Sequence, residues 1–580
     1  MDTWITDTSP RTRFRYFTRA NADEVGPEPF SPLGWSLGFL QGTGPGAADG
    51  FVTFGVVTAE ELAPDHQIFG NWGSYFYNPM SLSRLLGVRM PGVDVDAIDK
   101  AYFGDHPGVP PYEPDPQDES PERSEHLAVT LGRVMDAESW PAMDEAVALS
   151  RKAVANRPRF GDLGDAELVA YARRMAQEIR RAWGPYCEVV LGASIGPGAV
   201  AAVCEALGRG SDTVKLFTGI GGVESAGGGL ALWSLSRRVR GSVELTRQFD
   251  AGPAGLLDRI RASDSPDARE FLTDLDTTLR DYGHRGPHEW DMRSHSWDTR
   301  PELVLGMVDR IRLQGDDHDP AVVAAAAAAE RRRLSAEISA MLAGDPESQA
   351  VFLAGLRSGT VFYQTREAGK SAVIRLHHEA KLALFELGRR MVERAVLDDP
   401  QQLFMLLEPE LDRFVEDPAE WSATLRDRAR SFDALKALEP PYIVDARVGP
   451  PPLSEWTRRG GSGGDVVREG DVLQGAPASP GLATGRARVI LDPEVSELEP
   501  GDVLVCPTTD PSWTPLFLAT AAVVCDVGAV GSHAAIVSRE LGVPCAVSVH
   551  DATRRIPEGA TVTVDGSTGQ VTVVSVPAAP

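Results

Sequence analysis

The sequence predicts a multidomain protein in which a mostly α-helical part is followed by a C-terminal α/β domain. The chain has 580 residues, which at about 150 residues per domain allows up to roughly four domains. Apolar residues recur at helical spacing from about residue 124 to 444, and short β-type segments begin after a stretch rich in proline and glycine. The predicted parts are a helical domain (1–446), a linker (447–474) and an α/β domain (475–580).

The composition excludes several classes of protein. Apolar residues make up 42% of the chain and charged residues 24%, as in ordinary globular proteins, and no run of about 18 apolar residues predicts a membrane span. The formal net charge of −26 disfavours nucleic-acid binding, because it repels phosphate backbones. The N-terminus lacks a signal-peptide pattern, and the five cysteines form no CxxC pair. We therefore expect a cytoplasmic protein without disulfides or membrane spans.

The first 92 or so residues are rich in aromatic and turn-forming residues. Three prolines between Arg19 and Trp35 exclude a single helix there. The segment 69–77 is typical of a short strand or hairpin. Trp35 and Trp72 are candidates for lining an apolar substrate pocket. The alternative is that they belong to the core, which is the commoner position for such residues.

Amphipathic helices are predicted in the middle of the chain, after a loop rich in proline and aspartate at 105–122. The best-defined ones span 166–182, 320–342 and 366–396. Such helices bury their apolar faces against one another, which favours a helical bundle. Gly369 inside the third helix costs about 1 kcal/mol relative to alanine, which indicates that a neighbouring group approaches closely there.

The C-terminal part alternates β segments with one clear helix. Gly528 and Gly531 permit a tight turn before the helix, Ser532 is the predicted N-cap, and Gly542 and Pro544 end the helix. The predicted β segments are 482–491, 502–507, 522–527, 545–549 and 561–574, and the helix spans 532–541.

His533 falls in the first turn of this helix. The predicted helix turns Ile536 and Val537 inward and Arg539 and Glu540 outward. The positive end of the helix dipole disfavours an imidazolium and leaves the ring neutral and nucleophilic. A phosphate on that ring would meet unpaired backbone N–H groups. The pattern is therefore compatible with a phosphorylated histidine, and the alternative is a structural histidine near a helix cap.

The segment from Cys525 to Cys545 resembles the phosphohistidine swivelling domain of the PEP-utilising enzymes, a family that includes PEP synthase and rifampicin phosphotransferase. The Ser-His-Ala-Ala-Ile run around His533 carries the resemblance, and segments 478–489 and 509–517 extend it. Cys525 and Ala529 stand where the family pattern has threonine and glycine.

The resemblance implies a role for each residue around the histidine. It implies that His533 carries a phosphoryl group. It also implies that Gly528, Gly531 and Ser532 form the turn that faces the phosphate.

The upstream part is similar to the antibiotic-binding domain of rifampicin phosphotransferases. Segments 17–36, 222–233, 282–291 and 387–400 carry this similarity, so the resemblance covers most of the chain. It implies a helical domain that binds the phosphoryl acceptor.

Arg366-Glu-Ala-Gly-Lys370 fits an Arg-Glu-x-x-Lys element that the family places beside the phosphohistidine. Arg366 and Lys370 are four residues apart and share a helix face, so they are suited to hold a phosphoryl group during transfer. Glu367, in the first turn of the predicted helix, is a candidate general base toward an acceptor hydroxyl. The alternative is an ordinary solvated helix face.

A second polar cluster consists of His284, Arg285, His288 and Glu289, bracketed by glycines in a predicted loop. It is either part of the acceptor pocket or a structural hydrogen-bond hub. Two histidines at this spacing in a loop set no metal geometry, so we predict no metal site.

The expected function combines these features. No ATP-grasp segment precedes the acceptor-domain signature and no PEP-binding barrel follows, so we expect a separate ATP-grasp protein, using ATP with Mg²⁺, to phosphorylate His533. The histidine would pass the phosphate to a hydroxyl of a small molecule, antibiotic-like or a biosynthetic intermediate. The ester would be the product or a leaving group for elimination or cyclisation. The alternative is a catalytically degenerate binding or regulatory protein of the same fold.

Overall fold

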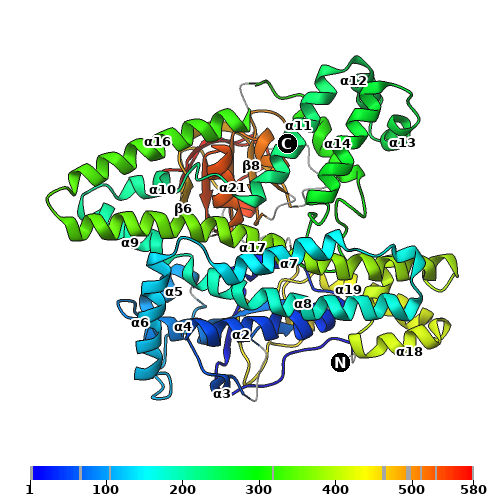
Figure 1. The fold of residues 1–580 in the computed structure, drawn as a ribbon, viewed down its shortest axis with the longest axis horizontal. Helices are drawn as coiled ribbons and strands as arrows, with labels where there is room; N and C mark the ends of the chain where they lie inside the picture. The colour runs from blue at the N-terminus through cyan, green and yellow to red at the C-terminus, as the bar shows by residue number, and fades with distance from the viewer. Residues whose placement is uncertain are drawn as a thin grey trace. The chain divides into compact units, whose positions relative to one another are not determined.

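The computed structural model describes residues 4–63, 68–103, 106, 108–316, 319–459, 466–491, 498–509, 513–528 and 532–577. The chain divides into two compact units (Figure 1). Unit 1 comprises Met1–Ala193, Trp290–Ser294 and Gly369–Gly461. Unit 2 comprises Ser194–Glu289, His295–Ala368 and Ser462–Pro580.

Unit 1 is mainly helical, as the apolar spacing predicts. A π-helical segment, η1 (Gly34–Thr43), runs into α2, and α2 packs along α8. The other helices and turns complete the unit. The helices are α1 (Ala22–Val25), α2 (Gly44–Phe54), α3 (Ala59–Leu62), α4 (Met80–Arg89), α5 (Val95–Phe103), α6 (Pro121–Asp136), α7 (Pro141–Ala155), α8 (Asp165–Gly192), α18 (Leu411–Glu416) and α19 (Ser422–Leu435), with 3-10 turns η2 (Phe160–Asp162), η5 (Pro400–Met405), η6 (Glu408–Glu410), η7 (Pro418–Trp421) and η8 (Leu453–Glu455).

A small antiparallel sheet in unit 1 joins distant parts of the chain. Its strand order is β2-β3-β1-β4, from β1 (Tyr16–Thr18), β2 (Gly70–Trp72), β3 (Tyr75–Pro79) and β4 (Ile443–Asp445). The hairpin predicted over 69–77 is therefore confirmed as β2 and β3.

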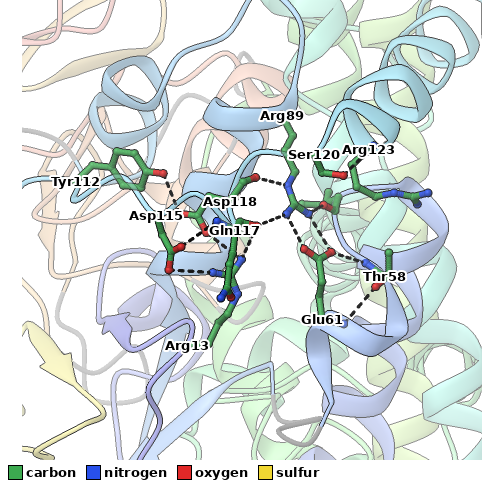
Figure 2. Close-up of polar contacts among 11 residues, drawn as sticks. Arg13, Thr58, Glu61, Arg89, Tyr112, Asp115, Gln117, Asp118, Ser120 and Arg123 are labelled. Atoms are coloured by element: carbon green, nitrogen blue, oxygen red, sulfur yellow. Dashed lines mark hydrogen bonds and ion pairs between the residues drawn. The ribbon is translucent and has the colours of Figure 1, made fainter.

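A buried arginine holds the proline- and aspartate-rich loop of unit 1 in place (Figure 2). Arg89 donates to the Asp118 carbonyl (2.7 Å) and to both carboxylate oxygens of Glu61 (2.6 and 3.0 Å). It also donates to the carbonyls of Val56 and Gln117. One side chain thus satisfies backbone acceptors of a loop that has no regular secondary structure of its own.

The long helix α17 (Pro346–Glu393) starts well before the predicted 366–396 helix. Its start is marked by Asp345, whose carboxylate accepts the N–H of Ser348 (3.1 Å), followed by Pro346 in the first turn. Residues of α17 before Gly369 group with unit 2, and the others with unit 1.

Unit 2 combines helices with the C-terminal sheet. The helix-rich part followed by a sheet-containing domain confirms the predicted order of the chain. Its helices are α9 (Ile195–Ala206), α10 (Thr213–Leu216), α11 (Glu224–Gly241), α12 (Val243–Asp250), α13 (Leu256–Arg261), α14 (Pro266–Tyr282), α15 (Glu302–Ile311), α16 (Pro320–Met341), α20 (Thr514–Ala519), α21 (His533–Leu541) and α22 (Ala552–Arg555), with the 3-10 turn η3 (Gly210–Asp212).

The sheet of unit 2 has the order β5-β12-β11-β7-β8-β9-β10-β6, with β7 to β10 parallel. The segment predicted over 561–574 is a hairpin of two strands. Only Gly475 separates β5 from β6, although they stand at opposite ends of this order, so the sheet curls to bring them near each other. The strands are β5 (Val472–Gln474), β6 (Ala476–Ser479), β7 (Leu482–Val489), β8 (Val503–Cys506), β9 (Ala522–Cys525), β10 (Cys545–Val547), β11 (Thr561–Asp565) and β12 (Gln570–Ser575).

The two faces of this sheet have separate cores because successive strand residues point to opposite sides. Val503, Val505 and Val524 pack on one face with β11, β12 and α22. Leu504 and Val523 pack on the other face, where α20 and α21 lie together with α11, α14 and α15. The face that carries α21 is thus also the face covered by the upstream helices of unit 2.

The predicted domain limits differ from this grouping. Helical residues 194–289 and 295–368 group with the C-terminal sheet, whereas the predicted helical domain contains them. Within the predicted linker, Trp456 is buried and donates its Nε1–H to the Pro451 carbonyl (2.9 Å), β5 joins the sheet, and 460–465 lie outside the described residues. The limits 1–446, 447–474 and 475–580 stay predictions.

One helical stretch, Asp165–Ala206, is long and apolar enough to cross a membrane by length and composition. Half of its most apolar window is buried inside the protein. This is weak evidence for a span, because a core helix passes the same test.

Candidate functional site

His533 is the first residue of α21, which follows β9 and the turn that contains Gly528. The Ser532 side chain accepts the N–H of Ala535 (3.4 Å), and Gly542 ends the helix at φ 65°. The predicted cap, helix and helix end are confirmed. Gly531 lies outside the described residues.

The His533 ring is held by two threonine hydroxyls of the same domain. Its Nδ1 lies 3.1 Å from Thr509 Oγ1, and its Nε2 lies 3.4 Å from Thr514 Oγ1. The ring of Phe517 meets it edge-on at 6.2 Å. His533 is 2% exposed. Because a hydroxyl can donate or accept, this arrangement suits a neutral imidazole in either tautomer.

Thr509 and Thr514 are residues that the sequence analysis did not single out. The only signal was that segment 509–517 resembles the family. α11 approaches the same place, because a Cβ added at Gly229 would lie 3.1 Å from Thr514 Cγ2. His533 therefore lies next to Thr514, at the place where the segment 509–517 approaches Gly229 of α11.

The turn before His533 contains a glycine in a conformation that other residues avoid, and a buried carboxylate. Gly528 has φ 156°, and a Cβ there would lie 3.0 Å from Val547 Cβ, so glycine is required. Burial raises the pKa of Asp526 to about 6, although Thr553 opposes this by donating its N–H (2.8 Å) and its hydroxyl. The base of the turn is thus fixed through Asp526.

The Arg366, Glu367 and Lys370 element lies in the middle of α17, so the expectation that Glu367 is in a first helical turn was wrong. Glu367 is 2% exposed, and its Oε2 has no hydrogen-bond partner among the described residues. Lys370 is buried too, and Arg366 is half-buried. Arg366 and Glu367 belong to unit 2 with His533, and Lys370 belongs to unit 1. Their catalytic roles stay predictions.

The His284, Arg285, His288 and Glu289 cluster forms a tight loop in unit 2. Arg285 pairs with Glu289 (3.3 Å), and its carbonyl accepts the N–H of Trp297 (2.7 Å). These contacts fit the structural-hub interpretation, and a role in acceptor binding stays a prediction. Among the described residues, no group of three His, Cys, Asp or Glu side chains is arranged to hold a metal ion.

The two candidate pocket tryptophans lie in packed aromatic clusters of unit 1. Trp35 stacks on Phe39 at 5.1 Å, and Trp72 meets Phe17 edge-on at 5.2 Å. Both tryptophans are buried. This placement agrees with the alternative that they are core, and substrate binding by them stays a prediction.

Comparisons with known proteins agree with this site. The family model for the fourth domain of rifampicin phosphotransferase matches residues 187–367, and that for the mobile domain of PEP-utilising enzymes matches residues 498–569. The second match contains His533 and both threonines. Over these residues the chain is therefore similar to PEP-utilising enzymes.

Individual relatives give a more specific similarity. Rifampicin phosphotransferases from Streptomyces sviceus and Bacillus subtilis are 32% and 31% identical, over 53% and 51% of this chain and 35% and 34% of their own length. An uncharacterized protein of Mycobacterium tuberculosis is 32% identical over 56% of this chain and 33% of its own. The chain thus spans about a third of the length of these relatives. Over these parts the chain is similar to rifampicin phosphotransferases and to the mobile domain of PEP-utilising enzymes.

Proposed function

We propose that the chain is the carrier-and-acceptor component of an ATP-dependent phosphotransferase. His533 takes a phosphoryl group and passes it to a hydroxyl of a small molecule. The placement of His533 carries this proposal: it is the first residue of α21, with each ring nitrogen beside a threonine hydroxyl. The relatives named rifampicin phosphotransferase favour an antibiotic-like acceptor. The ester is either the product or a leaving group for a later elimination or cyclisation.

The proposed chemistry has two phosphoryl transfers. In the first, a ring nitrogen forms a P–N bond as the P–O bond to the donor breaks. Nε2 is the better nucleophile here, because its 3.4 Å contact with Thr514 is long for a hydrogen bond to a hydroxyl and is lost at less cost than the contact of Nδ1. The positive end of the α21 dipole then stabilises the phosphate charge.

In the second transfer, the acceptor oxygen forms a P–O bond as the P–N bond breaks. The acceptor proton goes to a carboxylate, for which Glu367 is the candidate because its Oε2 is buried without a hydrogen-bond partner among the described residues. Arg366, and Lys370 on the same helix, supply positive charge for the transferring group.

The source of the phosphoryl group is part of the same proposal. We propose that ATP and Mg²⁺ act at a separate ATP-grasp protein, which phosphorylates His533 in trans. The proposal of a separate ATP-grasp protein is supported only by the sequence motifs. The test therefore adds that protein as a separate reagent.

Labelling of His533 tests the proposed function. ATP labelled on its β-phosphate is given to the wild-type chain, with and without an ATP-grasp protein that is active on another carrier. We expect acid-labile label on the wild type only when that protein is present. His533→Ala should remain unlabelled. His550→Ala, which removes an exposed histidine of the same domain, should be labelled like the wild type.

Two results would change this conclusion. Label on the wild type without the added protein would show that the phosphoryl source lies within this chain. No label under any condition would favour a catalytically degenerate binding protein.

A further inference from the structure

The outer face of α21 is buried, in contrast to the sequence expectation. Arg539 and Glu540 were predicted to point to solvent, and this was wrong: they are 2% and 7% exposed. The cause is tertiary packing within unit 2, where α16 lies along α21 (Figure 1). Charged side chains are almost never fully buried unless they are paired, so the burial of Arg539 and Glu540 indicates contacts with other elements.

Glu540 makes that contact with the loop between α10 and α11. Its Oε1 accepts the N–H of Ile220 (3.1 Å) and its Oε2 accepts the N–H of Gly221 (3.3 Å). Gln364 of α17 donates to the Gly221 carbonyl (2.8 Å) from the other side. Burial raises the pKa of Glu540, and the two loop N–H groups act in the opposite direction. The loop thus binds the Glu540 carboxylate through the N–H groups of two successive residues.

The loop has the backbone conformation that such a receptor needs. Gly219, Gly221 and Gly222 have φ of 62°, 68° and 66°. A left-handed residue next to a right-handed one turns neighbouring N–H groups toward one point, which forms an anion-binding concavity. Non-glycine residues adopt these angles at a cost. The glycines therefore shape the loop around Glu540.

Apolar contacts surround this polar pair. Ile536 packs in one cluster with Ile220, Val223 and Tyr363. The Arg539 guanidinium lies over the Tyr363 ring at 5.6 Å. A Cβ added at Gly542 would lie 2.1 Å from Val323 Cγ1, so α16 also reaches the end of α21. The whole outer face of α21 is therefore docked on α16, α17 and the loop 219–222.

We propose that Glu540 is the docking residue of the His533 carrier, and that the loop 219–222 is its receptor on the helical part of unit 2. This inference rests on the proposed function. In the docked arrangement His533 is 2% exposed, and undocking of α21 from the helices is the step that would open its ring to a phosphoryl donor. Glu540 is a positioning residue: it sets how long the carrier stays docked and does not contact the reacting atoms.

Glu540→Gln tests the proposal with a nearly isosteric change. Loss of the charge weakens two charge-assisted hydrogen bonds, for which we expect about a tenfold shift in the docking equilibrium. Hydrogen exchange of α21 and of the loop 219–222 should become about tenfold faster. His533 should be labelled faster, and transfer to the acceptor should be slower.

Gly221→Ala tests the receptor from its own side. A Cβ at Gly221 meets no atom within 4 Å, so this substitution acts only through its φ of 68°. It should speed exchange of α21 in the same way. The double variant with Glu540→Gln should show less than the product of the two single effects, because both remove one interaction.

Each variant has a matched control. Glu558 also accepts a backbone N–H, that of Val489 (2.7 Å), within the C-terminal domain, so Glu558→Gln should leave α21 exchange unchanged. Gly208 has φ 67° and open space around its Cβ, so Gly208→Ala repeats the strain of Gly221→Ala elsewhere.

The outcomes separate docking from the proposed function. Exchange in Glu540→Gln equal to that of the wild type, or equal effects of Glu558→Gln, would overturn the docking role. Faster exchange of α21 and the loop 219–222 in both variants, with unchanged controls, would support it. An unlabelled wild type would count against the proposed function, while the exchange data would still decide the docking role.

Discussion

At the scale of single residues, the protonation of Asp526, in the turn before His533, makes the stability of the fold depend on pH. Its pKa is about 6 in the folded protein against an ordinary value of 3.8, with burial as the largest cause. A carboxyl group whose pKa is higher in the folded than in the unfolded state contributes stability that is fully present below about pH 4. This contribution is lost as pH rises through about 6.

Asp526→Asn should therefore change the pH dependence of stability. Relative to the wild type, the free energy of unfolding of the variant should rise by up to about 3 kcal/mol between pH 4 and pH 7, since one pKa unit corresponds to about 1.4 kcal/mol. Urea denaturation of both full chains at several pH values measures this difference.

Asp502 is the matched control with the opposite sign. Its pKa is lowered by Arg486 and Arg488 against the effect of burial, so its contribution is present at neutral pH and lost as pH falls. Asp502→Asn should reduce the loss of stability on acidification. The same pH trend in both variants would contradict the assigned pKa directions.

Residue-level prediction from the sequence succeeded where the signal was local. Ser532 caps the start of α21 and Gly542 ends the helix, as predicted, because caps depend on neighbouring backbone groups. The contacts of His533 with Thr509 and Thr514 could not be predicted, because they depend on how separate segments return to the same face of the sheet.

At the scale of elements, Gly369 shows the close approach that its place in a helix predicts. A Cβ there would lie 2.8 Å from Met143 Sδ and from Tyr186 Cδ2. Gly369→Ala should lower the free energy of unfolding by about 1–2 kcal/mol, because overpacking outweighs the gain in helix propensity. Thermal or urea denaturation measures the change.

Gly132 in α6 provides the comparison. It is exposed and a Cβ there meets no atom within 4 Å. Gly132→Ala should raise the free energy of unfolding by about 0.5–1 kcal/mol through helix propensity alone. If both alanine variants were stabilised, close packing at Gly369 would be refuted.

The Arg89 network is a second element-scale feature (Figure 2). Arg89→Lys keeps the charge but loses the planar fork that serves Glu61 and the loop carbonyls, so we expect a loss of about 2–4 kcal/mol. Protease cleavage within 108–120 should also become faster.

Arg123→Lys is the control for this loss. Arg123 pairs with Glu122, which is exposed, so its replacement should cost less than about 0.5 kcal/mol. Equal losses in the two lysine variants would show that the geometry of Arg89 is unimportant.

Element prediction failed where distant parts of the chain decide the outcome. The apolar period located α8 and α16, and the cap signals located α21, but the helical period placed Arg539 and Glu540 on a solvent face. A helical period identifies the most apolar face only, and it contains no information about a second packing partner such as the loop 219–222.

At the scale of the whole molecule, all five cysteines are free and buried: Cys187, Cys204, Cys506, Cys525 and Cys545. Burial raises the pKa of the Cys187 and Cys506 thiols, and a thiolate is the reactive form. The native chain should therefore react slowly with a thiol reagent, and the denatured chain should show five reactive thiols. A fast stoichiometric reaction in the native chain would contradict this burial.

The whole-molecule order of a helix-rich part followed by an α/β domain could be predicted, because composition and period change near residue 450. The grouping of 194–289 and 295–368 with the C-terminal sheet could not be predicted. It depends on long-range packing such as that of α11 against α20 and α21, which no local pattern encodes.

The short strands β5 and β6 have a consequence for aggregation. They occupy the two outermost positions of the sheet and are consecutive in the chain. A fragment that begins at residue 498 would lose both, together with β7, and would leave long strands with unpaired backbone groups that a second copy could extend. In the full chain these two short strands block such growth, so a carrier that leaves its helices exposes no long strand on which a fibre could start.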